Sequence, residues 1–175
     1  STMGARDNKD PRNSLFKDQK GAKQDSIKDF CKKIKLIKKT RNSKDFLIGA
    51  RIESVILGKG LNDGLKRAKA YSEAGADLIL IHSKEKTPKE IFSFARIFTK
   101  TKYFKPLVSV PSTYSKTTES MLTKNGFQIV IYANHMLRAS YPAMEDAARN
   151  ILKNKRSFEL EKKISSVSEV INLIK

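Results

Sequence analysis

Short apolar runs alternate along this chain with stretches in which apolar residues recur every three or four positions. The apolar runs lie at 46–53, 77–82, 106–110 and 127–133. A run of this kind predicts a strand, and the recurring pattern predicts an amphipathic helix. We expect the helices at about 62–74, from 87 onward, at about 117–125 and at about 136–153. The pattern therefore predicts four strand-helix units in succession.

Local signals mark several helix ends. Gly75 and Gly126 follow two of the helical stretches, at positions where a left-handed residue commonly ends a helix. Residues 87–90 combine a capping-box pattern with proline at the first helical position. A second capping box at 166–169 predicts a last short helix near the C-terminus.

A further amphipathic helix is predicted ahead of the first strand, from Asp25 as N-cap to about Arg41. Residues 1–23 are polar, contain turn-forming residues and show no hydrophobic period, so we expect a loop or a mobile lid. These patterns predict a mobile segment at 1–24 and a folded domain at 25–175.

Repeated strand-helix units restrict the fold class. A parallel return needs a connection of helix length, so successive units of this kind form a parallel sheet with right-handed crossovers. The class is α/β. Strands that are almost continuously apolar fit a sheet covered on both faces. Periodicity alone does not distinguish an open doubly wound sheet from part of a closed barrel.

Polar side chains follow the apolar body of each predicted strand. They are Arg51 and Glu53, His82 and Ser83, Ser112, and Asn134 and His135, in the order of the four strands. In a β/α barrel the catalytic groups project from the carboxyl ends of the strands, so we expect these residues to share one pocket. A plainer interpretation is that Arg51 and Glu53 pair with each other, being two apart on one strand face, and that His82 is a cap or loop residue.

The net charge of +18 has two interpretations. A basic surface can bind nucleic acid, but the lysines are interleaved with acidic residues, and no aromatic RNA-binding pattern, zinc-ligand spacing or helix-turn-helix signature accompanies them. We favour a solvated surface and no nucleic-acid partner. The single cysteine, Cys31, lies in a helical apolar pattern and is expected to be a buried structural thiol. No apolar run reaches membrane-spanning length and no signal sequence is evident, so we expect a soluble, cytoplasmic protein with no membrane partner.

Several separated segments resemble the phosphoenolpyruvate mutases of the isocitrate lyase/phosphoenolpyruvate mutase superfamily. They are 45–54, 60–71, 74–77 and 81–84 for the family's fifth and sixth strand-helix units, and 110–112, 133–135 and 137–140 for its last two. The resemblance extends from about Asp7 to the C-terminus and is specific, because the motifs keep the family's order and spacing. It implies the C-terminal half of a TIM-type β/α barrel, with about four strand-helix units and terminal helices.

The resemblance also implies roles for individual residues. Arg51 and His82 match family residues that contact the charged groups of the substrate, which suits a permanently charged guanidinium with a hydrogen-bond donor beside it. Glu53 matches a residue that acts on magnesium through water. Residues 11–15 resemble the family's gating loop. The expected catalytic residues are thus Arg51 and His82, and the expected substrate-binding set is Asn13, Ser14, Arg51, His82, Ser112 and Asn134.

The chain departs from the family in two respects. Residues 7–9 stand two positions too close to Asn13, compared with the family's acidic motif ahead of the gating loop. Nothing here corresponds to the first four strands, which carry the family's nucleophilic and magnesium-binding aspartates. The resemblance therefore implies an isomerase of phosphonate biosynthesis that interconverts phosphoenolpyruvate and phosphonopyruvate, of which this chain is a fragment inactive alone. The main ligands of its Mg²⁺ are expected in the missing N-terminal half.

The implied partners are the substrate and either a complementary N-terminal half-barrel or further copies of the chain. Three alternatives stay open. One is a phosphonopyruvate hydrolase, although hydrolases tend to carry threonine where Asn13 stands. Another is a carbon-carbon lyase, although lyases resemble one another in a loop cysteine that is absent here. The third is a non-catalytic half-barrel that serves only in assembly.

Overall fold

The computed structural model describes residues 3–4 and 24–174. Five strands form one parallel sheet in the order β1-β2-β3-β4-β5. The strands are β1 (Met3–Gly4), β2 (Gly49–Ile52), β3 (Leu78–Ile81), β4 (Leu107–Ser109) and β5 (Phe127–Val130). The helices are α1 (Ile27–Thr40), α2 (Gly60–Ala74), α3 (Lys89–Phe98), α4 (Glu119–Lys124), α5 (His135–Asn154) and α6 (Val167–Asn172).

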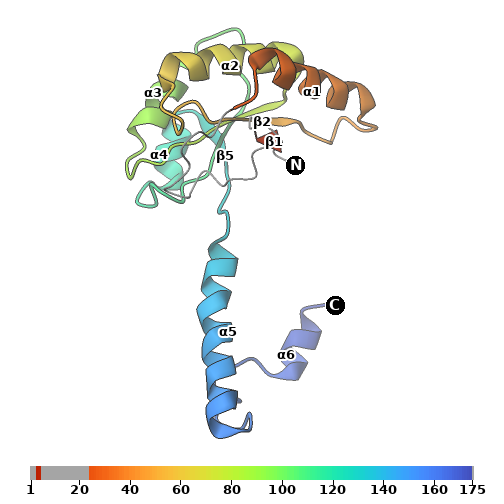
Figure 1. Ribbon diagram of the computed structural model, residues 1–175, viewed down its shortest axis with the longest axis vertical. Coiled ribbons are helices and arrows are strands. Elements are labelled where there is room, and N and C mark those ends of the chain that lie inside the picture. The colour runs from red at the N-terminus through yellow and green to blue at the C-terminus, as the bar shows by residue number, and fades with distance from the viewer. Residues whose placement is uncertain (1–2, 5–23, 175) are drawn as a thin grey trace. The chain divides into compact units, whose positions relative to one another are not determined.

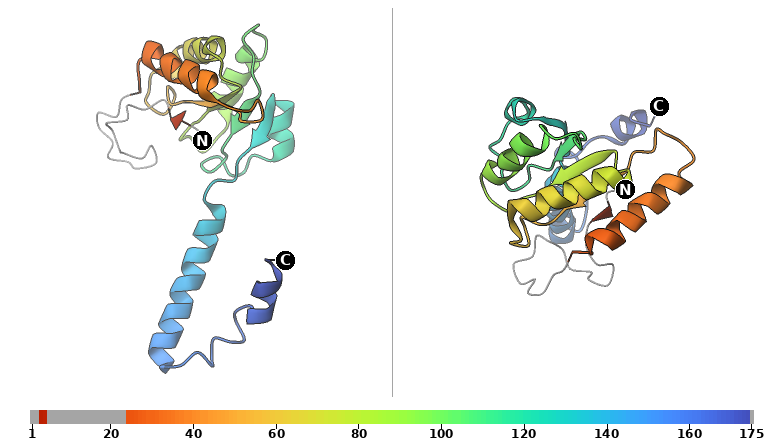
Figure 2. Two further views of the ribbon diagram at one scale, coloured as in Figure 1. Left: turned by 90° about the vertical axis from the view of Figure 1, so that its right-hand side faces the viewer. Right: turned by 90° about the horizontal axis from the view of Figure 1, so that it is seen from above.

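The sequential strand order identifies the kind of sheet. When each right-handed crossover leads to the next neighbour on the same side, all the connecting helices lie on one face of the sheet. Figure 1 shows α1, α2 and α3 together on one side of the strands, and α1 and α2 lie next to each other in the right-hand view of Figure 2. A doubly wound sheet reverses its strand order at a switch point, and the described strands contain no such reversal. The predicted α/β class, with the winding of a barrel segment, is confirmed.

Strand register divides the sheet into two faces. Ala50 pairs with Ile79, Ile52 with Ile81, and Leu107 lies between Ile79 and Phe127. These residues are buried with the apolar sides of α1, α2 and α3 in one core cluster. Arg51 pairs with Leu80, and Leu80 with Val108, on the opposite face. Because the helices cover the first face, Arg51 points to the face that lies inside a closed barrel.

Two of the helix ends predicted from the sequence are confirmed, one at a glycine and one at a capping box. Gly75 ends α2 in the left-handed region, with a φ of 110°. Ser166 and Glu169 form the predicted capping box at the start of α6. The cap of α1 differs by one residue, because the side chain of Ser26, and not that of Asp25, accepts a hydrogen bond from the first turn.

The predicted capping box at 87–90 is wrong. Pro88 occupies the cap position of α3 and makes no side-chain cap hydrogen bond. The carboxylate of Glu90 instead accepts a hydrogen bond from the hydroxyl of Ser83, at 2.5 Å. A bond to a neighbouring loop has therefore replaced the local one.

Part of the N-terminal prediction can be compared with the structure. Met3 and Gly4 form a short strand against Ala50 and Arg51, where only loop was expected. The rest of the predicted lid lies outside the described residues, so its mobility stays a prediction. Cys31 is partly buried, its thiol lies 3.5 Å from the Ala70 carbonyl oxygen, and burial raises its pKa, as expected of a structural thiol.

The chain divides into two compact units, 1–132 and 133–175. The sheet, α1 to α4 and the core cluster belong to the first unit. Within the second unit, α5 has no buried side chain, and its exposed face includes an ion pair between Arg149 and Glu145. No helix in the described part of the chain is long and apolar enough to span a membrane.

Candidate active site

Arg51 and Glu53 lie at the carboxyl end of β2. Arg51 belongs to the strand and Glu53 follows it by one residue, so both side chains can reach the same side. The Nε of Arg51 donates a hydrogen bond to Oε1 of Glu53. The Glu53 side chain is almost fully buried, whereas about a quarter of the Arg51 side chain is exposed. The ion pair anticipated from their spacing is thus present, and it fixes the orientation of the guanidinium.

His82 directly follows β3, the neighbouring strand. Ile52 pairs with Ile81, so His82 lies next to Glu53 in the continuing register. Only 3% of His82 is exposed, and this burial, together with the positive charge of Arg51, lowers its pKa from 6.5 to about 4. His82 is therefore neutral at pH 7. A neutral imidazole can donate one hydrogen bond and accept another.

Three buried polar atoms at the strand ends have no hydrogen-bond partner among the described residues. They are Oε2 of Glu53, Nδ1 of His82 and Oγ of Ser112, from the loops after β2, β3 and β4. Buried polar atoms in proteins are nearly always paired with protein or water, so exceptions point to a bound group or ordered water. The three atoms lie at the same edge of the sheet, since the carboxyl ends of parallel strands meet there.

A buried polar network supports the loop that follows Glu53. The hydroxyl of Ser54 donates to Asp63 of α2 at 2.7 Å, and the Nε of Arg67 donates to the same carboxylate oxygen at 2.8 Å. Gln24 also reaches Asp63, at 3.2 Å, and Arg67 donates to the hydroxyl of Tyr71 at 2.9 Å. The network joins the carboxyl end of β2 to α2 and to the start of α1. Sequence reasoning missed it, although opposite charges four residues apart on α2 were a signal.

A second set of bonds supports the loop that follows His82. Ser83 donates to Glu90 at the start of α3, and its carbonyl accepts a hydrogen bond from Thr113 of the next loop at 2.9 Å. The hydroxyl of Ser83 also accepts from the backbone N–H of Glu85 at 3.0 Å. Neighbouring loops are therefore tied together around His82, which explains its deep burial.

The remaining predicted residues lie elsewhere. Asn13 and Ser14 are outside the described residues. Asn134 belongs to the second unit, where it precedes α5 with a φ of 56° and makes no side-chain cap hydrogen bond. The structure thus brings Arg51, Glu53 and His82 together, and the full substrate-binding set stays a prediction.

A magnesium site was tested against the same residues. No group of three or more His, Cys, Asp or Glu side chains in the described part of the chain could hold a metal ion. Mg²⁺ requires six oxygen ligands in near-octahedral geometry and commonly keeps several of them as water. The buried Oε2 of Glu53 suits a contact through water, but one carboxylate oxygen is not a ligand set. The described residues therefore do not fit a complete magnesium site.

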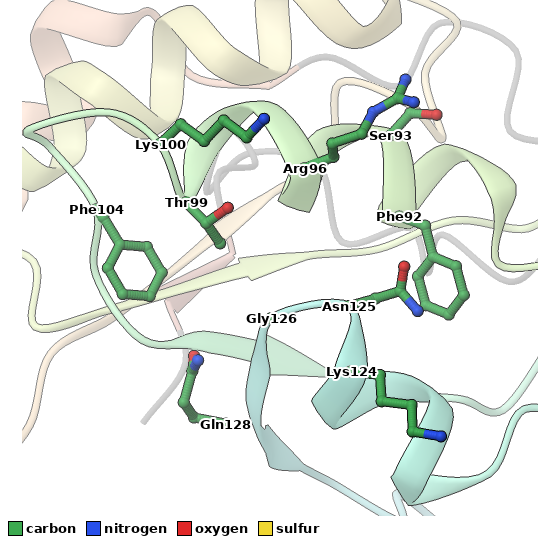
Figure 3. Close-up of a pocket in the computed structure, with 10 residues that line it drawn as sticks. All are labelled: Phe92, Ser93, Arg96, Thr99, Lys100, Phe104, Lys124, Asn125, Gly126 and Gln128. Atoms are coloured by element: carbon green, nitrogen blue, oxygen red, sulfur yellow. The ribbon is translucent and has the colours of Figure 1, made fainter.

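The largest of the cavities that we describe lies outside this site. It has a volume of about 570 Å³ and lies between α3, the end of α4 and β5 (Figure 3). Its cationic residues are Arg96, Lys100 and Lys124, whose charged ends do not converge in Figure 3. Arg96 and Lys124 lie in the last turns of α3 and α4, where cations stabilise the helix dipole. None of the strand-end residues lines this cavity.

Comparisons with known proteins place this geometry in a family context. The family model described as phosphoenolpyruvate phosphomutase matches residues 9–152. The chain is similar to a phosphoenolpyruvate phosphomutase of Tetrahymena pyriformis, with 40% identity over 93% of this chain and 53% of the relative. It is also similar to a phosphonopyruvate hydrolase of Variovorax sp. (strain Pal2), with 39% identity over 84% of this chain and 50% of the relative.

Solved structures give the same result. A phosphoenolpyruvate phosphomutase from Streptomyces platensis subsp. rosaceus superposes with a TM-score of 0.89 and 32% identity, over 98% of this chain and 58% of that one. A phosphonopyruvate hydrolase in complex with oxalate and Mg²⁺ superposes with a TM-score of 0.83 and 34% identity, over 98% of this chain and 57% of that one. The chain spans about half the length of the curated relatives it matches.

Proposed function

This chain belongs to the phosphoenolpyruvate phosphomutase family, and from that premise we propose that it supplies half of the active site of an isomerase that interconverts phosphoenolpyruvate and phosphonopyruvate. The observation that carries the proposal is the position of Arg51 and His82 at the ends of adjacent strands, close enough for the charge of Arg51 to act on the imidazole. In the reaction a P–O bond breaks and a P–C bond forms, so the atoms rearrange without gain or loss.

The residues of this chain would bind and orient the substrate. Arg51 would bind an anionic group of the substrate, with its guanidinium held in place by Glu53. His82, being neutral, would donate a hydrogen bond to a substrate oxygen without adding a positive charge. Neither residue would accept the phosphoryl group. We assign that step to an aspartate of the complementary half, as the family resemblance implies.

Magnesium enters the proposal only through Glu53. When bound, the ion would stabilise negative charge that develops on the reacting oxygens. Since the described residues do not fit a complete site, we propose that its main ligands come from the complementary half and that Glu53 acts through water.

A phosphonopyruvate hydrolase is the second candidate, because its identity to this chain is nearly as high as that of the mutase. Asn13 favours the mutase, since hydrolases of the family tend to carry threonine at that position. The two activities differ in their products from phosphonopyruvate, which are phosphoenolpyruvate for a mutase and pyruvate with inorganic phosphate for a hydrolase. Phosphorus NMR of the assembled enzyme distinguishes them.

The role of Arg51 can be tested with Arg51→Lys in this chain, assembled with the N-terminal half of the Tetrahymena relative. Lysine keeps the charge but loses the planar fork, so we expect kcat/KM to fall about tenfold to a hundredfold. Arg96→Lys, on the exposed face of α3, is the matched control and should change kcat/KM less than about twofold. Unchanged turnover in Arg51→Lys would show that the guanidinium of Arg51 does not bind the substrate.

A further inference from the structure

One side-chain hydrogen bond joins the loop after β3 to the loop after β4. The hydroxyl of Thr113 donates to the backbone carbonyl of Ser83 at 2.9 Å. Ser83 directly follows His82, and Thr113 directly follows Ser112. Both of these preceding residues have a buried polar atom without a hydrogen-bond partner among the described residues, Nδ1 of His82 and Oγ of Ser112. The bond therefore connects the immediate neighbours of two residues from the expected substrate-binding set.

Both ends of this bond are anchored. Ser83 is fully buried, and its hydroxyl donates to the carboxylate of Glu90 at the start of α3, at 2.5 Å. Tyr114, the residue after Thr113, is also fully buried, and its hydroxyl lies 3.1 Å from that of Ser109 on β4. Since each loop is fixed to its own strand or helix, the bond between Thr113 and Ser83 sets how the two loops lie relative to each other.

The pairing of β3 with β4 does not extend to these loops. Its last pair is Leu80 with Val108. His82 and Ser112 both lie beyond that pair, so backbone pairing between the two strands does not hold them together. The hydroxyl of Thr113 connects the two segments where the sheet pairing has ended.

We propose that Thr113 is a positioning residue, whose hydroxyl holds Ser112 and His82 at the separation at which both reach one substrate. The inference rests on the proposed function and deepens it, because it names a residue that shapes the same site without touching the substrate. A displacement of about 1 Å at a reacting centre can cost on the order of a hundredfold in rate. Loss of one hydrogen bond between the loops is therefore expected to matter more for turnover than for binding.

Histidine ring NMR of the full chain tests the position of His82 without any reaction. The chain contains two histidines, His82 and His135, and His82→Gln assigns their signals. At pH 7, Thr113→Val should shift the ring nitrogen signals of His82, because valine keeps the shape of threonine but lacks the hydroxyl. The signals of His135 should stay in place. Thr113→Ser, which restores the hydroxyl, should keep the His82 signals near their wild-type positions.

Thr99→Val is the matched control for both measurements. The hydroxyl of Thr99 also donates to a backbone carbonyl, that of Ala95 at 2.8 Å, but it does so at the end of α3. Its loss removes the same kind of bond without joining or freeing the two loops. Thr99→Val should therefore leave the His82 signals unmoved.

Steady-state kinetics of the chain assembled with the N-terminal half of the Tetrahymena relative measures the effect on the reaction. In Thr113→Val, kcat should fall about tenfold to a hundredfold while KM changes less than about threefold, because Arg51 still binds the substrate. A merely structural bond would lower the unfolding temperature without this split. Thr113→Ser should restore kcat to within about threefold, and Thr99→Val should change it less than about twofold.

Two results would overturn the proposal, namely unmoved His82 ring signals in folded Thr113→Val, or a wild-type kcat in that variant. If Thr113→Val does not fold, Thr113→Ala removes the same hydroxyl and gives the same comparison. An absence of turnover in the verified wild-type assembly would contradict the proposed isomerase instead, and the ring signals would still decide whether Thr113 positions His82.

Discussion

His82 is buried at the carboxyl end of β3, beside a strand whose Arg51 carries a positive charge. Burial and that charge both disfavour the imidazolium, so the pKa falls to about 4 in the folded chain, whereas an unfolded histidine titrates near 6.5. Between these values the unfolded chain binds a proton that the folded chain does not. The stabilising contribution of neutral His82 is therefore complete above about pH 6.5 and is lost as the pH falls toward about 4.

We expect the free energy of unfolding to drop by up to about 3 kcal/mol from this residue between pH 7 and pH 4. Urea denaturation at a series of pH values measures the slope. His82→Gln cannot titrate and should lose this part of it. His135→Gln, which changes the other of the two histidines, should keep it. Equal slopes in His82→Gln and the wild type would show that His82 titrates normally.

The site was only partly predictable at this scale. The pairing of Arg51 with Glu53 could be anticipated, because residues two apart on a strand share a face. The burial of His82 could not, because it depends on Ser83, Glu90 and Thr113, which the fold brings together from two loops and a helix. Local sequence does not contain such contacts.

At the scale of elements, Gly64 within α2 and Gly75 at its C-cap have different backbone conformations. Gly75 ends the helix with a φ of 110°, where a side chain is strained and a Cβ would collide with Lys38. Gly64 lies within the helix, and the nearest atoms to a Cβ there are 3.8 Å away on Ile81 and Phe94. One position requires glycine and the other has room for a methyl group.

The same substitution should therefore have opposite effects at the two positions. Gly75→Ala should lower the free energy of unfolding by about 1–2 kcal/mol, because alanine is strained in the left-handed region. Gly64→Ala should raise it by about 0.5–1 kcal/mol, because alanine favours helix. Thermal unfolding followed by circular dichroism compares the two. A loss of similar size in both would contradict the conformations described for α2.

Arg67 connects α2 to the segment ahead of α1 through one buried guanidinium. It bonds to Asp63 and Tyr71 on α2 and to the backbone carbonyl of Asp25 ahead of α1. Arg67→Met keeps much of the side-chain volume but removes the Arg67 donor from the Asp25 carbonyl and the Tyr71 hydroxyl, and one of several donors from Asp63. We therefore expect a loss of about 2–4 kcal/mol in the free energy of unfolding. Arg96→Met, on an exposed face, should change it by less than about 0.5 kcal/mol. Urea denaturation of both variants gives the comparison. Equal free energies of unfolding would show that the bonds of Arg67 do not stabilise the fold.

Helix ends were predictable where the signal was local. Gly75 ends α2, and Ser166 and Glu169 form the capping box of α6, as their residue types favour. The box expected at 87–90 failed because Glu90 finds a tertiary partner in Ser83. The local preference of Glu90 for a capping bond was outweighed by a hydrogen bond to the hydroxyl of Ser83 in a neighbouring loop.

At the scale of the whole molecule, periodicity predicted an α/β chain but not its winding. The strand order β1-β2-β3-β4-β5 decides the winding, because it places the crossover helices on one face and leaves Arg51 on the other. The polar strand ends had favoured a barrel for a related reason, since a barrel collects such residues at one end. The division after Tyr132 had no counterpart in the pattern, which predicts residues 136–153 as one more helix following a strand.

The central claim is that Arg51 and His82 form one half of a split active site, and phosphorus NMR tests it most directly. Residues 1–175 alone, supplied with phosphonopyruvate and magnesium, should leave the phosphonopyruvate signal unchanged, because a positioned nucleophile is required and the matched positions offer none. After addition of the N-terminal half of the Tetrahymena relative, with assembly verified by sedimentation, that signal should give way to phosphoenolpyruvate. Turnover by the chain alone, or none in the verified assembly, would contradict the claim.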